Sequence, residues 1–451
     1  MVQQPVLDDP AVDASTQVES FWPSAPESVL QTGLPAEFLG ELVLKSLFVG
    51  GPATLEELGE RVGTSYSLTD ELTTHLKTEQ SIEATSATGY SDWGIRYRLT
   101  GRGTELAQSA LERSRYVGIV PVMLAEYTRM TQQQALRRNP PTPKMLEQAF
   151  APFVLSAVIK DSLARIFYSG RTVLIFGDSG NGKTSIVESY AKTFVGAVLF
   201  PHALYVAGQV IRIYDPVRHQ MLPLESQSSE IDDGVSLLRG AGHPTAFDRR
   251  WIKIRRPVVL VGGELEVADL NLTYDATTRQ YQAPAHMKAQ DGIFMIDDFG
   301  RQRARPEEIL NRWIVPLESG TDTLTLQTGE SFSIPFEMAL IFASNLKPKD
   351  LADEAFLRRL PYKMNLPGPD RELFSEIARM WCRRLEIAFE EEDIGYLTDK
   401  LFNDPKIQPR ATHPRDLGLM ILDYARYDHA EAALTRDYVD KACSVYFIYD
   451  S

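Results

Sequence analysis

Apolar and polar residues follow three successive patterns along the chain. Apolar residues first recur every three or four positions in the segments 36–49, 54–62 and 65–79, which predicts three amphipathic helices. Two strand-like runs joined by a turn-rich loop follow at 81–100, and a fourth helical pattern covers 104–117. The first quarter of the chain is therefore expected to fold as helices around a β-hairpin.

The middle of the chain changes to short β-branched and aromatic runs. A long helical pattern over 145–170 precedes the first run, 171–176, and similar runs recur at 258–263, 292–298 and 338–345. Helical or loop segments separate these runs, and this alternation is typical of a parallel β-sheet with crossover helices. From about residue 370 the pattern becomes purely helical, which predicts a small C-terminal lid.

These patterns divide the chain into five expected parts. The weakly apolar start cannot bury enough surface to fold and predicts a disordered tail. The helices with their hairpin resemble a winged helix, and the segment ending in the helix-breaking RRNPPTPK is interpreted as a linker. The expected bounds are 1–26 for the tail, 27–117 for the winged-helix-like domain, 118–143 for the linker, 144–369 for the α/β body and 370–451 for the lid.

Composition and charge narrow the class of protein. The 451 residues are 43% hydrophobic and 24% charged, which is near the average of globular proteins. The net charge of −14 argues against broad electrostatic capture of nucleic acid or an anionic membrane. The two cysteines lie in apolar stretches without metal-ligand spacing, and no uninterrupted run of 18 apolar residues occurs. We expect a cytoplasmic protein with reduced cysteines and no membrane insertion.

A phosphate-binding loop follows the strand-like run at 171–176. The sequence GDSGNGKT fits GxxxxGK[ST] fully and stands between an expected strand and an expected helix. Glycines let successive backbone N–H groups point at phosphates, the lysine reaches the β- and γ-phosphates of ATP, and the threonine hydroxyl can bind Mg²⁺. The expected nucleotide-binding residues are Gly177, Asp178, Ser179, Gly180, Asn181, Gly182, Lys183, Thr184 and Ser185.

Two acidic residues end the apolar run GIFMIDD. Asp297 and Asp298 stand at the carboxyl end of an expected strand, where parallel sheets place their ligand-facing residues. We expect Asp297 to hold Mg²⁺ together with Thr184, and Asp298 to orient the attacking water. The later strand ends in Asn345, whose amide could contact the γ-phosphate or the water.

The order of these motifs resembles the AAA+ ATPases. A phosphate loop, an acidic strand, a helix with a hairpin, and a strand ending in Asn follow one another as in that family, and 291–345 is similar to its MoxR-type and enhancer-binding branch. The resemblance implies a ring-forming homo-oligomer, such as a hexamer, that uses ATP and Mg²⁺ to remodel a protein partner whose identity the motifs leave open. It further implies that Arg358 or Arg359 is an arginine finger and that Arg415 lies on a sensor-2 helix facing the nucleotide.

Two departures qualify this resemblance. The catalytic acid of the family is usually Glu, whereas Asp298 is one methylene shorter, so hydrolysis could be slow. The long separation of Thr184 from Asp297 requires an insertion, which we place at about 216–290 with a hairpin near its end. Trp251 and Tyr281 in this insertion are candidates for substrate contact, although core packing is the favoured role of Trp251.

The winged-helix-like domain raises a second hypothesis, that of a DNA-associated ATP switch. Its third helix would enter the major groove, yet it carries Asp70, Glu71 and Glu79 and few basic residues. Only Arg96, Arg98 and Arg102 in the hairpin region favour contact with a DNA backbone, so we favour protein interaction over DNA binding. A third hypothesis is a nucleotide-gated scaffold that hydrolyses ATP slowly.

Overall fold

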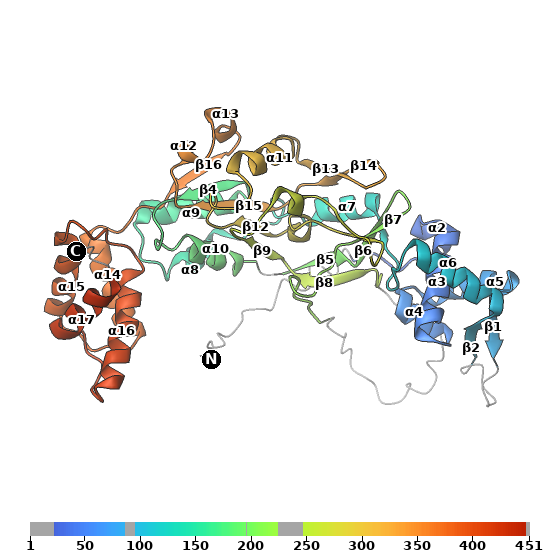
Figure 1. Cartoon of the computed structure of the whole chain (residues 1–451), viewed down its shortest axis with the longest axis horizontal. Helices are drawn as coiled ribbons and strands as arrows, with labels where there is room; N and C mark the ends of the chain where they lie inside the picture. Colours follow the sequence, from blue (N-terminus) through green and yellow to red (C-terminus); the bar gives the residue numbers. More distant parts are fainter. Residues whose placement is uncertain (1–21, 86–94, 195, 224–246, 448–451) are drawn as a thin grey trace.

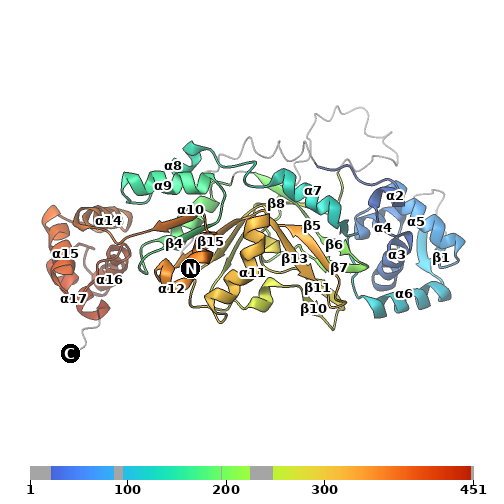
Figure 2. The same ribbon diagram turned by 90° about the horizontal axis from the view of Figure 1, so that it is seen from above.

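The computed structural model describes residues 22–85, 95–194, 196–223 and 247–447. The helices of the lid and those of the N-terminal part stand at opposite ends of a central α/β body (Figure 1). Figure 2 shows the same order from above. No helix in the described ranges combines the length and the hydropathy needed to cross a membrane.

The N-terminal part contains the predicted helices and hairpin strands. Its helices pack around a shared leucine-rich core, and the described strands β1 and β2 are antiparallel. Thr54 and Glu57 form a capping box at the start of α4. The elements are α2 (Val29–Thr32), α3 (Ala36–Gly50), α4 (Leu55–Val62), α5 (Tyr66–Thr78), β1 (Ile82–Thr85), β2 (Arg96–Leu99) and α6 (Gly101–Arg113). The loop between the two strands lies outside the described residues.

The expected linker at 118–143 is instead part of the body. It contains β3 (Val122–Met123) and α7 (Leu124–Gln134), and Tyr127 and Met130 are buried in the core of the body. The Gln134 side chain donates to the Leu199 carbonyl at 2.8 Å and accepts from the Leu199 N–H at 2.9 Å. These contacts hold α7 against the body, and they involve residues distant in sequence, so the local pattern alone predicted a linker.

Trp22, at the end of the expected tail, is also packed. Its ring lies 5.1 Å from the ring of Phe247, and its indole N–H donates to the Asp248 carbonyl at 3.1 Å. Ser65 donates to the Pro26 carbonyl at 2.6 Å. Residues 22–26 therefore belong to the folded part of the chain.

The central sheet is parallel and has the strand order β16-β4-β15-β12-β9. This confirms the predicted α/β fold with a parallel sheet and flanking helices. Alternate residues of β12 enter two cores: Phe294 packs with Trp313 of α11, and Met295 packs with Tyr190 of α10. Figure 1 shows α11 and α10 on opposite sides of the sheet. The strands are β4 (Val173–Phe176), β9 (Val258–Val261), β12 (Ile293–Ile296), β15 (Ala339–Ser344) and β16 (Tyr362–Asn365).

A second sheet, of order β10-β11-β7-β6-β3, and the antiparallel pair β5–β8 extend the body. Of these strands only β8, β10 and β11 lie within the predicted insertion at 216–290, whereas β9 in the same range belongs to the central sheet. The predicted hairpins at 270–284 and 322–336 are confirmed as β10–β11 and β13–β14. The strands are β5 (Ala197–Pro201), β6 (Ala203–Val206), β7 (Gln209–Arg212), β8 (Trp251–Arg255), β10 (Thr273–Asp275), β11 (Gln280–Gln282), β13 (Thr321–Thr325) and β14 (Ser331–Pro335).

The predicted long helix at 145–170 is two helices. The first ends at Phe150, just before Pro152, because proline lacks the N–H that would continue the helix and its ring clashes with the preceding turn. Ser156 then caps the second by accepting from the Ile159 N–H. The helices of the body are α8 (Pro143–Phe150), α9 (Ala157–Tyr168), α10 (Lys183–Ala191), α11 (Pro306–Ser319), α12 (Pro348–Leu351) and α13 (Glu354–Leu357).

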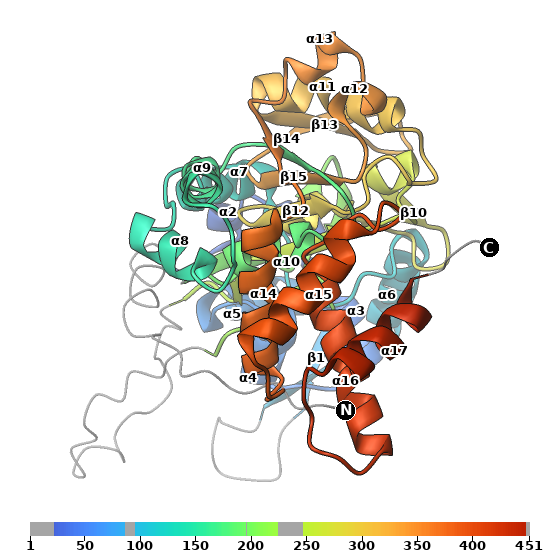
Figure 3. The same cartoon turned by 90° about the vertical axis from the view of Figure 1, so that its left-hand side faces the viewer.

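The C-terminal lid is helical, as predicted. Its helices enclose their own core, which contains both buried cysteines, Cys382 and Cys443. Figure 3, viewed from the lid side, shows these helices in front of the body. They are α14 (Arg371–Arg384), α15 (Glu391–Asn403), α16 (His413–Tyr427) and α17 (Arg436–Tyr446).

Candidate functional site

The phosphate loop connects β4 to α10. Gly180 and Gly182 have φ angles of 84° and 86°, in the left-handed region that side chains disfavour. Gly177 has no room for a side chain, because a Cβ there would lie 2.2 Å from the Leu366 carbonyl oxygen of β16's continuation. The sequence pattern of glycines therefore follows from backbone shape and from close packing against the neighbouring strand.

Lys183 is the first residue of α10 and its side chain is folded over the loop. Its ammonium donates to the Gly177 carbonyl at 2.9 Å, to the Asp178 carbonyl at 3.0 Å and to Asn345 Oδ1 at 2.7 Å. Burial lowers the pKa of Lys183, while the nearby carboxylates of Asp297 and Asp298 act in the opposite direction. The cation is thus held where backbone and amide oxygens already replace part of its hydration.

Thr184 and Asp297 come together next to this lysine. The Thr184 hydroxyl donates to Asp297 Oδ2 at 2.8 Å, joining the start of α10 to the end of β12. The described residues contain no group of three or more His, Cys, Asp or Glu side chains that could hold a metal. One hydroxyl and one carboxylate suit Mg²⁺, since this ion keeps several waters and binds substrate phosphates rather than an all-protein cage.

Asp298 and Asn345 form the third part of the site. Asn345 Nδ2 donates to Asp298 Oδ1 at 2.6 Å, and the Asp298 backbone is left-handed with φ of 49°. Strand β15 lies between β4 and β12, so Asn345 at its end stands between the phosphate loop and the two acids. The sequence-predicted loop, acids and asparagine are therefore brought to one edge of the sheet.

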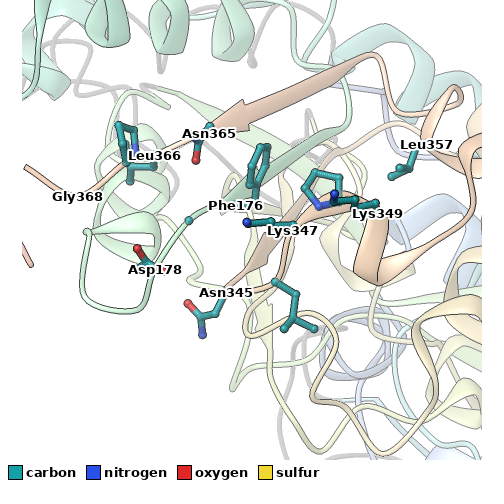
Figure 4. A pocket seen from close by; sticks show the side chains of 13 residues that line it. Phe176, Asp178, Asn345, Lys347, Lys349, Leu357, Asn365, Leu366 and Gly368 are labelled. Carbon is teal, nitrogen blue, oxygen red and sulfur yellow. The ribbon is translucent and has the colours of Figure 1, made fainter. Parts of the chain in front are cut away.

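A cavity of about 600 Å³ adjoins the loop. Figure 4 shows Asp178 and Asn345 near one another, with Phe176, Lys347 and Leu366 nearby. Its apolar wall could not be predicted from local patterns, because Phe176, Leu346, Leu357 and Leu366 come from four separate segments. The volume falls in the range of small-molecule sites.

The segment of the lid before α16 contacts the phosphate loop, and these contacts were not predicted from the sequence. Gln408 Nε2 donates to Asp178 Oδ2 at 2.7 Å. A Cβ on Gly180 would lie 2.6 Å from Thr412 Oγ1 and 3.6 Å from Arg410 Cδ. The predicted sensor residue Arg415 instead donates to Asp416, its neighbour on the first turn of α16, at 2.8 Å. Only the basic character of the loop before α16 hinted at Arg410, and local spacing could not place it beside Gly180.

Arg358 and Arg359 lie just after α13, away from these contacts. Arg358 pairs with Glu354 at 2.8 Å and is largely exposed, and Arg359 pairs with Glu318 at 2.5 Å. Both of these carboxylate partners, Glu354 and Glu318, lie outside the phosphate loop.

Trp251 and Tyr281, the candidates for substrate contact, are both buried. They are 3% exposed and belong to the core of the second sheet. The Tyr281 hydroxyl accepts from the Gln327 N–H at 3.0 Å. This confirms the favoured packing role of Trp251 and shows that the substrate-contact interpretation of Tyr281 was wrong, since its polar atom has a backbone partner inside the fold.

Comparisons with known proteins give a partial family match and distant structural similarity. A family model described as a domain of unknown function (DUF8689) matches residues 370–445, the lid helices. No curated protein matches the chain. The RuvB Holliday junction branch migration motor of Thermotoga maritima is similar at 11% identity over 71% of this chain and 74% of that chain, with a TM-score of 0.34. NtrX from Brucella abortus is similar at 13% identity over 74% of this chain and 66% of that chain, with a TM-score of 0.38.

Proposed function

We propose that this protein is a Mg²⁺-dependent AAA+ ATPase, in which ATP binding and hydrolysis within an oligomeric ring remodel or assemble a protein partner. The observation that carries the proposal is the convergence of Lys183, Thr184, Asp297, Asp298 and Asn345 at one edge of a parallel sheet. The hydrogen bonds of 2.6–2.8 Å between them join the phosphate loop to the acidic strand and to the asparagine strand.

Each residue has a distinct role in this proposal. The loop N–H groups and Lys183 bind the β- and γ-phosphates, and Lys183 exchanges its present carbonyl partners for phosphate oxygens. Thr184 and Asp297 would hold Mg²⁺, which neutralises charge on the phosphates. Asp298 orients the attacking water, and Asn345 holds the Asp298 carboxylate in place.

The lid supplies a second side to the same site. Gln408 and Arg410 approach the loop from the segment before α16, so their positions depend on how the lid sits on the body. A bound triphosphate would add charge-assisted contacts to Arg410. Nucleotide binding would therefore change the position of the lid relative to the body. The proposed remodelling function requires such a movement.

The hypothesis of a DNA-associated switch is less well supported than protein remodelling. Arg96 pairs with Glu57 at 2.6 Å and Arg98 pairs with Glu83 at 2.7 Å, so two of the three arginines that could contact a DNA backbone already have carboxylate partners, while Arg102 is exposed on α6. The expected winged-helix-like domain is therefore proposed to recruit a protein partner.

The Mg²⁺-dependent ATPase rate and the particle size, each measured with and without ATP, test the proposal. The full chain is expected to hydrolyse ATP only with Mg²⁺ and to form a larger particle when ATP is bound. A Lys183→Ala chain is the control, and it should lose tight ATP binding because the main phosphate-binding cation is removed. A ring that binds ATP without measurable turnover would favour the slow scaffold, and a wild-type chain that binds no ATP would refute the proposal.

A further inference from the structure

A second recess lies between the N-terminal part and the second sheet, and the proposed ATPase cycle does not use it. It has a volume of about 330 Å³. One wall is the segment 115–119, which connects α6 to β3, and the other is formed by β7, β11 and the loops beside β6. Figures 1 and 2 show β7 at the end of the body nearest α6. The lining residues are Arg115, Tyr116, Val117, Gly118, Ile119, His202, Arg212, Tyr214 and Gln280.

Two exposed guanidinium groups, those of Arg115 and Arg212, line this recess. Within the described ranges, neither Arg115 nor Arg212 has a salt bridge, and none of the nine lining residues is acidic. The neighbouring Arg113, by contrast, pairs with Glu41. The backbone N–H of Arg115 donates to the Thr278 carbonyl at 3.1 Å, which fixes this segment against the sheet. The recess is thus a positive site in a chain whose net charge is −14.

Neutral polar groups complete the lining. Burial lowers the pKa of His202 to about 4, so its imidazole is uncharged near neutral pH and can both donate and accept. The Tyr214 ring packs against His202 with ring centroids 5.7 Å apart. Asp215, the next residue, is held by Lys288 at 3.0 Å and does not neutralise the arginines.

We propose that this recess binds the phosphoryl group of a small molecule, with Arg115 and Arg212 as the charged ligands and His202 and Tyr214 as hydrogen-bonding partners. Guanidinium groups match the oxygens of a phosphate in charge and in geometry. The recess has the size of a small-molecule site rather than of an extended nucleic-acid surface. The phosphoryl group belongs either to inorganic phosphate or to a small organic phosphate.

Isothermal titration calorimetry on the full chain tests this site. The Lys183→Ala chain serves as host, because its phosphate loop no longer competes for the probes. Inorganic phosphate and ribose 5-phosphate are titrated separately at constant ionic strength, and their relative affinities identify the source of the phosphoryl group. At least one probe is expected to bind at one equivalent per chain. Arg115→Gln and Arg212→Gln should each weaken this binding about tenfold or more, as expected for loss of a charge-assisted hydrogen bond.

A matched control separates site binding from general charge effects. Arg102→Gln removes the same charge from an exposed position on α6 outside the recess and should change the affinity by less than about twofold. Thermal melting verifies that each variant is folded, and Arg115→Gln alone carries the test if Arg212→Gln melts early. The proposal is overturned if neither probe binds at millimolar concentration, or if all three substitutions weaken binding equally. Binding of a single-stranded DNA oligonucleotide without binding of either small probe would also overturn it and assign the recess to nucleic acid.

Discussion

Lys183 and Asn345, 162 positions apart in the sequence, share a hydrogen bond of 2.7 Å between the ammonium group and the amide oxygen. The amide nitrogen of the same Asn345 donates to Asp298. One side chain thus joins the phosphate-binding cation to the proposed water-orienting acid. In the proposed ATP complex Lys183 would turn toward phosphate oxygens and release Asn345, so the state of the phosphate loop would be transmitted to Asp298.

Asp298→Asn is expected to leave ATP binding intact and to slow turnover by about 10²-fold or more, since a positioned acid or base contributes about that factor. Asn is nearly isosteric and tolerates the left-handed backbone found at this position. ATP affinity and steady-state hydrolysis are measured side by side. The exposed Asp437→Asn, which makes the same charge change on α17, should alter neither quantity. Hydrolysis by Asp298→Asn at the wild-type rate would contradict the proposed role of Asp298.

Arg410→Ala is expected to weaken ATP binding more than Arg415→Ala does. Arg410 lies beside Gly180 of the phosphate loop, whereas Arg415 is engaged by Asp416. Loss of a charge-assisted contact should reduce the affinity about tenfold or more, and both variants remove one positive charge from the same part of the lid. Fluorescent-nucleotide titration of both variants compares them directly. A larger loss with Arg415→Ala would restore that residue to the nucleotide-facing role that the AAA+ resemblance implies.

Much of the fold and of the site's core could be predicted from the sequence, because both depend on local patterns. The run RTVLIF followed by glycines and a lysine determines a strand, a loop and a helix, and GIFMIDD places its acids at a strand end. The pairing of Gln134 with Leu199, or the approach of Arg410 to Gly180, depends on segments that are distant in sequence. Local spacing in the sequence could therefore not predict which distant residue Gln134 or Arg410 contacts.

The same limit applies to the recess between Arg115 and Arg212. Each arginine taken alone has the sequence context of an ordinary surface cation. Their common environment arises only when the connection between α6 and β3 packs against β7 and β11. Conversely, Tyr281 could be considered a substrate contact only while its buried position in the second sheet was unknown.

The full chain is expected to bind duplex DNA only weakly, with a dissociation constant that is micromolar or weaker at physiological salt. Arg96 and Arg98 are paired with Glu57 and Glu83, and breaking these pairs would offset part of any gain from phosphate contacts. Fluorescence anisotropy with two duplexes of unrelated sequence measures affinity and sequence dependence together. A nanomolar affinity for one duplex alone would favour the DNA-associated switch over protein remodelling.

Acidification is expected to destabilise the lid through His413. Burial lowers the pKa of His413 to about 4, and its Nδ1 accepts from the Arg410 N–H at 3.2 Å. The unfolded chain therefore binds a proton at higher pH than the folded chain does, so stability is fully present above about pH 6.5 and falls as pH decreases toward 4. Between pH 6.5 and pH 5 the expected loss is about 2 kcal/mol.

His413→Asn keeps a hydrogen-bond acceptor and removes this titration. Chemical unfolding of both chains at pH 7 and pH 5 compares them, and taking the difference cancels the contributions of the other histidines. The stability of the variant relative to wild type should increase from pH 7 to pH 5. A difference that stays constant between the two pH values would exclude His413 as a source of acid sensitivity.

The final prediction concerns Arg358 and Arg359, which the AAA+ resemblance assigns to an arginine finger. In a ring, such a finger acts on the nucleotide of a neighbouring subunit, which agrees with the location of both arginines outside the contacts of their own phosphate loop. Loss of both should slow turnover about 10³-fold or more with little effect on ATP affinity, because the lost charge stabilises the transition state.

The Arg358→Ala/Arg359→Ala chain is mixed with the Lys183→Ala chain, and each alone is expected to be inactive. Some interfaces of a mixed ring join an intact loop to an intact finger, so mixing should restore part of the activity. The finger role is contradicted if two properly assembled variants restore no activity on mixing, or if the arginine variant binds ATP weakly. Both arginines would then have a structural role through their pairs with Glu354 and Glu318.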